Sequence, residues 1–70
     1  MDWTQVNSLH LSHVAYDDTD QVLGIRFQDG SEYQYHNVPM QLIEQLMRSG
    51  SKGRFFREQI KGKFEFERIT

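Results

Sequence analysis

The dipeptide Asp29-Gly30 places the strongest constraint on how this chain can fold, because it separates two short runs of alternating apolar residues. Residues 22–27 and 33–36 both have the period-two pattern and the β-branched and aromatic content of strands. An Asp-Gly pair between such runs is typical of a tight β-hairpin, since glycine adopts a positive φ without steric cost. The sequence therefore predicts two adjacent antiparallel strands at its centre.

The length of the hairpin loop decides which side chains share a face of the sheet. With a two-residue loop, Ile25 lies opposite Gln34, and the apolar side chains are divided between the two faces. With a three-residue loop, Ile25 lies opposite Tyr33, and Arg26 lies opposite Glu32. The second register gathers apolar groups on one face and pairs opposite charges on the other, so we favour it. It also places both tyrosines of the second strand on the face that helices are expected to cover.

A further strand is expected before the hairpin. Leu9, Leu11 and Ala15 alternate within residues 9–16, which predicts a strand with these three side chains on one face. Residues 1–5 are mostly polar and are expected to be a loose lead-in.

Two short helices and a last strand are expected after the hairpin. The first helix runs from Pro39 to about Arg48, because proline suits a helix start and an apolar stripe follows it. The second helix covers about residues 52–61, with Ser51 as its N-cap. Aromatic residues alternate with charged ones at 64–69, which indicates the last strand.

These elements predict an α+β fold with a small antiparallel sheet of three to four strands in the order β-β-β-α-α-β. The two short helices pack on one face of that sheet. Residues 1–70 are expected to form a single domain with its core at about residues 6–69, because so short a chain has no room for two cores. There is no cysteine and no long apolar run, so we expect a cytoplasmic protein without a membrane partner.

Nothing in the sequence points to catalysis. His10 and His13 are three residues apart on an expected strand, so they point to opposite faces and make a poor metal pair. No nucleophile-elbow motif and no phosphate-binding glycine loop with P-loop spacing occurs. We therefore expect a non-catalytic domain without a metal, a cofactor or a small-molecule substrate.

Charge is segregated along the chain, although the net charge is only −2. Residues 1–47 hold one basic and seven acidic side chains, whereas residues 48–63 hold six basic side chains and one acidic side chain. A local basic block in an acidic chain is either an anion-binding face or an ordinary solvated helix surface. As an anion-binding face, it gives these candidate nucleic-acid-binding residues: Arg48, Ser51, Lys52, Arg54, Arg57, Lys61 and Lys63.

Three tyrosines could add base stacking to such a face. Tyr16, Tyr33 and Tyr35 are the candidates, because an exposed aromatic ring can stack on a nucleobase. The favoured hairpin register gives Tyr33 and Tyr35 a mainly structural role instead. The stronger candidate for binding is therefore the segment from Ser51 to Lys63.

Several short motifs in this order resemble those of the KTSC domain family. They are Ala15-Tyr16-Asp17, Phe27-x-x-Gly30, Tyr33-x-Tyr35-x-x-Val38-Pro39, Ser51-Lys52-Gly53, Phe55-Phe56 and Ile60-Lys61-Gly62-Lys63-Phe64. The family is named for its occurrence at the C-terminus of some lysyl-tRNA synthetases, and it also occurs as single-domain bacterial and phage proteins. Its function is unknown, and the synthetase context suggests RNA binding. The resemblance implies no catalytic residue, and Ala15 departs from the glycine that is common there.

Two functions are therefore expected. The first is binding of tRNA-type RNA through the basic helix face. The alternative is a protein-protein interaction module or a homodimer that uses a sheet edge or the acidic hairpin.

Overall fold

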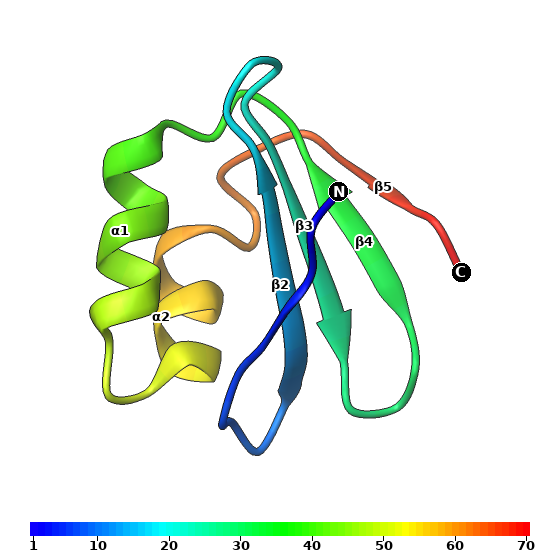
Figure 1. Cartoon of the computed structure of the whole chain (residues 1–70), viewed down its shortest axis with the longest axis vertical. Helices are drawn as coiled ribbons and strands as arrows, with labels where there is room; N and C mark the ends of the chain where they lie inside the picture. The colour runs from blue at the N-terminus through cyan, green and yellow to red at the C-terminus, as the bar shows by residue number, and fades with distance from the viewer.

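Five antiparallel strands form one sheet, and they follow one another across it in chain order. Both helices lie on the same side of this sheet (Figure 1). The computed structural model describes all 70 residues. Its elements are β1 (Thr4–Gln5), β2 (Leu11–Asp17), β3 (Val22–Phe27), β4 (Glu32–Tyr35), α1 (Met40–Arg48), α2 (Lys52–Gln59) and β5 (Phe66–Arg68).

The predicted α+β class, antiparallel sheet and pair of helices are confirmed, and the predicted count of three to four strands is wrong. The additional strand is β1, which forms inside the stretch that was expected to be a loose lead-in. Thr4 pairs with Val14 of β2, and Gln5 pairs with His13. Both residues of β1 are exposed, so no apolar alternation marks this strand in the sequence.

Trp3 explains how β1 is held against the sheet. A Cβ at Gly24 would lie only 2.8 Å from the Trp3 ring, so the indole packs directly on the backbone of β3. The guanidinium carbon of Arg26 lies 4.3 Å from the centre of the same ring, in a cation–π arrangement. Gly24 alternates with the buried Leu23 and Ile25, so Trp3 covers the face of the sheet opposite the helices.

The hairpin has the predicted three-residue loop. Gly30 has a φ of 91°, which is the left-handed conformation that favours glycine. Ile25 lies opposite Tyr33, and Arg26 lies opposite Glu32. The second pair forms a salt bridge of 3.1 Å on the face away from the helices. Pairing of apolar groups on one face and of opposite charges on the other therefore selects this register, as expected.

The strand before the hairpin differs from its prediction at a β-bulge. The register of β2 against β3 shifts between Leu11 and His13, so strict alternation is interrupted there. Leu11 consequently joins Val14 in the core instead of sharing a face with Ala15. Leu9 lies before the strand and is 91% exposed. The predicted grouping of Leu9, Leu11 and Ala15 on one face is therefore wrong.

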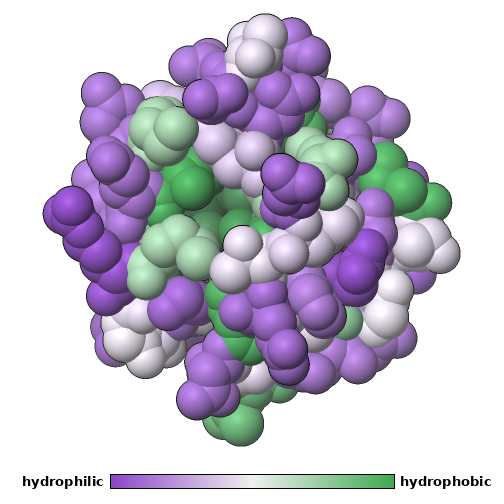
Figure 2. All heavy atoms as spheres, in the orientation of Figure 1, coloured by the Kyte–Doolittle hydropathy of each residue, from purple (hydrophilic) through white to green (hydrophobic).

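The core lies between the helices and one face of the sheet. Its largest fully buried side chains come from β2, β3, α1 and the residues that flank the two helices; they are Leu11, Leu23, Ile25, Leu46, Ile60 and Val38. Figure 2 shows that the outer surface in this view is mostly hydrophilic, with apolar side chains in small separate patches. Burial of the apolar stripes of α1 and α2 is the main stabilising contribution to such a fold.

The helix ends differ slightly from their predictions. Pro39 is the extended residue before α1, with a φ of −73° and a ψ of 152°, and is not the first helical residue. Ser51 lies at the N-cap position of α2, but its side chain makes no capping hydrogen bond. The first-turn N–H groups of Lys52, Gly53 and Arg54 therefore have no acceptor within the protein. Neither helix has the length and the apolar character needed to cross a membrane.

Candidate nucleic-acid interface

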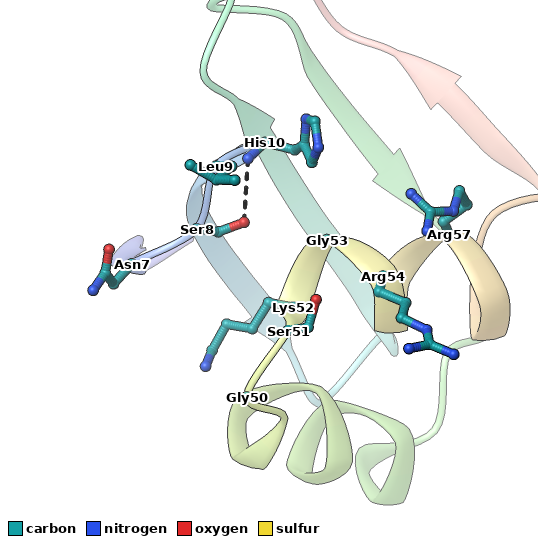
Figure 3. A pocket seen from close by; sticks show the side chains of 10 residues that line it. All are labelled: Asn7, Ser8, Leu9, His10, Gly50, Ser51, Lys52, Gly53, Arg54 and Arg57. Atoms are coloured by element: carbon teal, nitrogen blue, oxygen red, sulfur yellow. Dashed lines mark hydrogen bonds between the residues drawn. The ribbon is translucent and has the colours of Figure 1, made fainter.

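A cleft opens between the loop that joins β1 to β2 and the first turns of α2. Its volume is about 470 Å³, and nine of its ten lining residues are not hydrophobic. We call it the basic cleft, and it is lined by Asn7, Ser8, Leu9, His10, Gly50, Ser51, Lys52, Gly53, Arg54 and Arg57. Figure 3 shows the loop facing the start of α2 across this space.

The loop side of the basic cleft is held by a few short contacts. The Ser8 hydroxyl accepts hydrogen bonds from the N–H groups of His10 at 3.3 Å and Leu11 at 3.2 Å. The Gln28 amide donates to the Ser8 carbonyl at 3.0 Å. A Cβ at Gly53 would lie 3.2 Å from the His10 ring, so the absence of a side chain at Gly53 lets the loop approach α2.

The cations of the basic cleft differ in how far they are already engaged. Arg54 pairs with Glu58 at 3.2 Å, and the Lys52 ammonium donates to the Ser49 carbonyl at 3.0 Å. Arg57 has no ion pair in the structure. Figure 3 shows Lys52 extending away from Arg54 and Arg57. The strongest remaining attraction for an anion therefore comes from Arg57 together with the unpaired N–H groups at the start of α2.

A smaller hollow of about 200 Å³ continues from the basic cleft along α2. It shares His10, Gly53 and Arg57 with the cleft. Phe27, Phe56 and Lys61 line its other end and belong also to the next groove. The three depressions are therefore neighbours along α2 and share these residues as walls.

The third depression is apolar and rich in aromatic rings. Its volume is about 480 Å³, and we call it the aromatic groove, lined by Phe27, Asp29, Ser31, Tyr33, Tyr35, Phe56, Lys61, Gly62 and Phe66. The Phe66 ring lies 5.9 Å from that of Tyr33 and 5.5 Å from that of Tyr35, measured between ring centres. These separations are within the range of favourable aromatic packing. Phe66 is nevertheless 55% exposed, so the stack of rings ends in a ring that solvent can reach.

Two groups in the aromatic groove have shifted pKa values. Burial raises the pKa of the Tyr35 hydroxyl, and the neighbouring Tyr33 raises it further. Hydrogen bonds from the Ser31 hydroxyl and N–H lower the pKa of the Asp29 carboxyl. The distances from Asp29 Oδ1 to these two donors are 2.6 Å and 2.9 Å. The groove therefore holds a neutral phenol at its floor and a carboxylate at its rim at neutral pH.

The candidate binding residues fall into four positions. Ser51, Lys52, Arg54 and Arg57 line the basic cleft, and Lys61 lines both the connecting hollow and the aromatic groove. Lys63 lies in a shallow depression that includes Phe66. Arg48, at the end of α1, lines none of these depressions.

The candidate stacking residues are also separated. Tyr33 and Tyr35 line the aromatic groove, and Tyr35 is only 4% exposed. Tyr16 lies outside the groove, and its hydroxyl donates to the Val38 carbonyl at 2.6 Å. Burial raises the pKa of that hydroxyl, and the nearby carboxylates of Asp18 and Asp17 raise it further.

Sequence reasoning missed the loop Asn7–His10 and Phe66 as parts of this surface. The loop had no motif of its own, and the only signal was Gly53, a residue that lowers helix propensity inside a predicted helix. His10 was considered only as a metal ligand, and no group of three or more metal-ligating side chains occurs in the structure. The alternation at residues 64–69 predicts a strand but does not indicate that the Phe66 ring is exposed.

Comparison with known proteins shows what this chain is similar to. The KTSC domain family matches residues 7–64. A lysine–tRNA ligase of Trichormus variabilis is 42% identical over 60 residues, which cover 86% of this chain and 11% of the ligase. A protein of Tsukamurella paurometabola is 34% identical over 59 residues, which cover 84% of this chain and 88% of that protein. The chain thus spans about a tenth of the length of the lysine–tRNA ligases that it matches.

A solved structure has the same fold over almost the whole chain. The crystal structure of a KTSC domain protein from Yersinia pestis superimposes with a TM-score of 0.93 at 37% sequence identity. The alignment covers 99% of this chain and 97% of that one. The family match spans most of the chain, and the structural match extends over nearly all of it. The chain therefore belongs to the KTSC domain family.

Proposed function

We propose that this KTSC domain binds RNA without catalysis, through a basic strip that follows α2. The basic strip consists of Ser51, Lys52, Arg54, Arg57, Lys61 and Lys63. The observation that carries the proposal is that the basic cleft, the connecting hollow and the aromatic groove adjoin one another along one helix. Similarity to proteins named lysine–tRNA ligases supports it, because tRNA is the nucleic acid in that name.

Phosphate recognition would begin at the start of α2. The unpaired N–H groups of its first turn and the partial positive charge of a helix N-terminus suit a phosphate oxygen. Arg57 would supply a charge-assisted contact from the same cleft. The next phosphates of the strand would then lie beside Lys61 and Lys63, at the far end of the strip.

The segregation of charge limits where RNA could approach. The acidic side chains outnumber the basic ones by seven to one in residues 1–47, so the rest of the protein repels a polyanion. Binding would therefore be oriented by the strip, although the net charge of the chain is −2. Affinity should fall steeply with salt, because each phosphate contact releases counterions.

The test is a titration of fluorescently labelled tRNA and single-stranded RNA at several low salt concentrations. The double substitution Arg54→Glu and Arg57→Glu should weaken binding by at least about tenfold, because it places repulsive charge beside the phosphates. It should also make the slope of log affinity against log salt shallower by about 1.4 for single strands, the value for two lost contacts. Absence of binding to either RNA at low salt would overturn the proposal.

A matched pair of variants distinguishes an effect of the basic strip on RNA binding from an effect of the protein's net charge. Arg57→Glu and Arg48→Glu each reverse one exposed cation near the end of a helix, but only Arg57 lines the cleft. The first substitution should weaken RNA binding several-fold more than the second. Equal effects would mean that RNA responds to overall charge and that the strip is not a site.

One observation favours a second candidate function, which is protein binding at a sheet edge. β5 pairs with β4 on one side only, so its outer backbone groups are available to a partner strand. Phe66 and Ile69 are exposed beside this edge. Light scattering that shows a dimer, or loss of self-association on Phe66→Lys, would support this function in place of RNA binding.

A further inference from the structure

The basic strip accounts for phosphates, but it leaves the aromatic groove without a role. We propose that this groove binds one unstacked nucleobase of the RNA, so that the ligand of the domain is single-stranded RNA and not a continuous duplex. The proposal rests on the RNA binding proposed above and names the part of the RNA that is recognised.

The arrangement of the rings supports a stacking site. Tyr33, Tyr35 and Phe66 pack on one another, and Phe27 meets Tyr33 edge-on at 5.7 Å between ring centres. The groove that they line is therefore rigid, and its exposed end is the ring of Phe66. Stacking on a fixed ring costs little conformational entropy, because the aromatic side chain is already held by its neighbours.

Polar groups at the rim of the groove match the chemistry of a nucleotide. The Lys61 side chain lines the groove and has no ion pair, so it is available to the phosphate that adjoins a bound base. Asp29 and Ser31 line the same groove and could accept hydrogen bonds from the amino or imino groups of a base edge. A mainly apolar hollow with a few polar groups is the usual form of a site for a planar ring.

The connection to the basic cleft argues for a nucleotide and against an uncharged aromatic ligand. Arg57 and Lys61 both line the hollow between the cleft and the groove. From Gly53 to Lys61 the chain advances by about 12 Å if the helical rise of 1.5 Å per residue is extended over these residues. A base in the groove would therefore lie within a few nucleotides of a phosphate in the cleft.

The same geometry disfavours a continuous duplex. A base inside a duplex is stacked on both faces and cannot enter a groove that is lined by rings. Proteins that read single strands combine a positive surface along the backbone with aromatic rings for successive bases. The strip and the groove together have this combination, with one aromatic site.

The experiment compares two RNAs and two exposed apolar residues. Fluorescence anisotropy at low salt measures the affinity for a single-stranded oligonucleotide and for a hairpin duplex with the same number of phosphates. Phe66→Ala should weaken binding of the single strand by about 5- to 150-fold, which corresponds to the usual cost of removing one stacked base. Its effect on the duplex should be less than about twofold if the duplex uses phosphate contacts alone.

Ile69→Ala is the matched control. Ile69 is 45% exposed and adjoins β5, but it does not line the aromatic groove. Its substitution should leave the affinity for both RNAs unchanged. A second variant, Phe66→Leu, retains an apolar side chain without a π face and should behave like Phe66→Ala. Urea unfolding of each variant shows that the fold is retained.

Four results would overturn the proposal. Equal affinity of the wild-type protein for single strand and duplex would remove the need for an unstacked base. An equal loss on both RNAs, or an equal loss in Phe66→Ala and Ile69→Ala, would give the groove no specific role while RNA binding by the strip would stand. Absence of binding to either RNA would overturn the proposed function itself.

Discussion

The basic cleft and the aromatic groove both adjoin the hollow beside α2, but they are built from different parts of the protein. The cleft is formed by a loop, by backbone N–H groups and by side chains that extend into solvent. The groove is the outer margin of the core, since Tyr35 and Phe56 at its floor are 4% and 5% exposed. Phe56 meets both Phe27 and Tyr35 edge-on.

Because of this difference, residues of the basic cleft can affect binding without affecting stability. Residues at the floor of the aromatic groove affect both. Surface charges contribute little to the free energy of unfolding, so those of the cleft can change without loss of the fold. The rings at the floor of the groove cannot, because Tyr35 and Phe56 also fill the core, whereas Phe66 at its margin is exposed. The following predictions test this contrast.

Phe56→Ala should have the largest effect on stability. It removes a buried ring that the groove and the core share, and such substitutions cost about 3–5 kcal/mol of unfolding free energy. Urea unfolding followed by circular dichroism measures this loss, and Phe56→Leu is used if the alanine variant does not fold. The adjacent Arg57→Ala should change stability by less than about 0.5 kcal/mol. A loss below about 1 kcal/mol in Phe56→Ala would show that the groove is independent of the core.

Gly53→Val should have the next largest effect, and it tests whether the cleft depends on close packing. The new side chain would meet the His10 ring, because a Cβ there lies 3.2 Å from it. Overpacking of this kind costs about 1–3 kcal/mol. Gly50→Val is the control, since a Cβ at Gly50 has nothing within 4 Å and its change should be below about 0.5 kcal/mol.

A double variant tests whether contact with the His10 ring causes the loss of stability in Gly53→Val. Adding His10→Ala to Gly53→Val should recover part of the lost stability, because the obstructing ring is removed. If the effects of the two substitutions on the unfolding free energy simply add, the contact with His10 is not the cause.

Alkaline pH should weaken the groove more than the cleft. Burial raises the pKa of Tyr35 above its ordinary value of 10.0, so the folded protein holds this proton more tightly than the unfolded chain. The resulting stability is fully present below about pH 10 and is lost as pH rises through the higher pKa of the folded state. The difference in unfolding free energy between pH 8 and pH 11 should therefore be smaller in Tyr35→Phe than in the wild type. An equal difference would mean that Tyr35 ionises freely in the folded protein.

The hairpin was predicted correctly from the sequence, because residues on both faces of its two strands constrain their register. Opposing pairs of apolar and charged residues selected one register, and Gly30 supplied the required conformation. Prediction failed at β1, where Thr4 and Gln5 have no pattern and the strand depends on Trp3 reaching Gly24. It failed also at Leu11, because a bulge changes the face of every later residue and strict alternation does not reveal it.

Only the part of the candidate site that lies on α2 was predicted from the sequence. The positions of Arg54 and Arg57 on one side of α2 follow from helical periodicity, which is a local property, whereas Lys61 lies beyond the end of this helix at Gln59. The loop Asn7–His10 faces that helix only through the packing of distant segments, and no local pattern reports such packing. The exposure of Phe66 depends on β5 being at the edge of the sheet, which is a property of the complete topology.

The order of the strands has a consequence for the time course of folding. Neighbouring strands from β1 to β4 are also neighbours along the chain, whereas β5 reaches β4 only after both helices. Short loops close fast and at low entropic cost, so we expect β5 to dock last and to detach first. The aromatic groove includes Phe66 of β5, so it would exist only in the finished fold. A partly folded chain would already attract RNA through α2, and it would gain a place for a base only when its last strand docks.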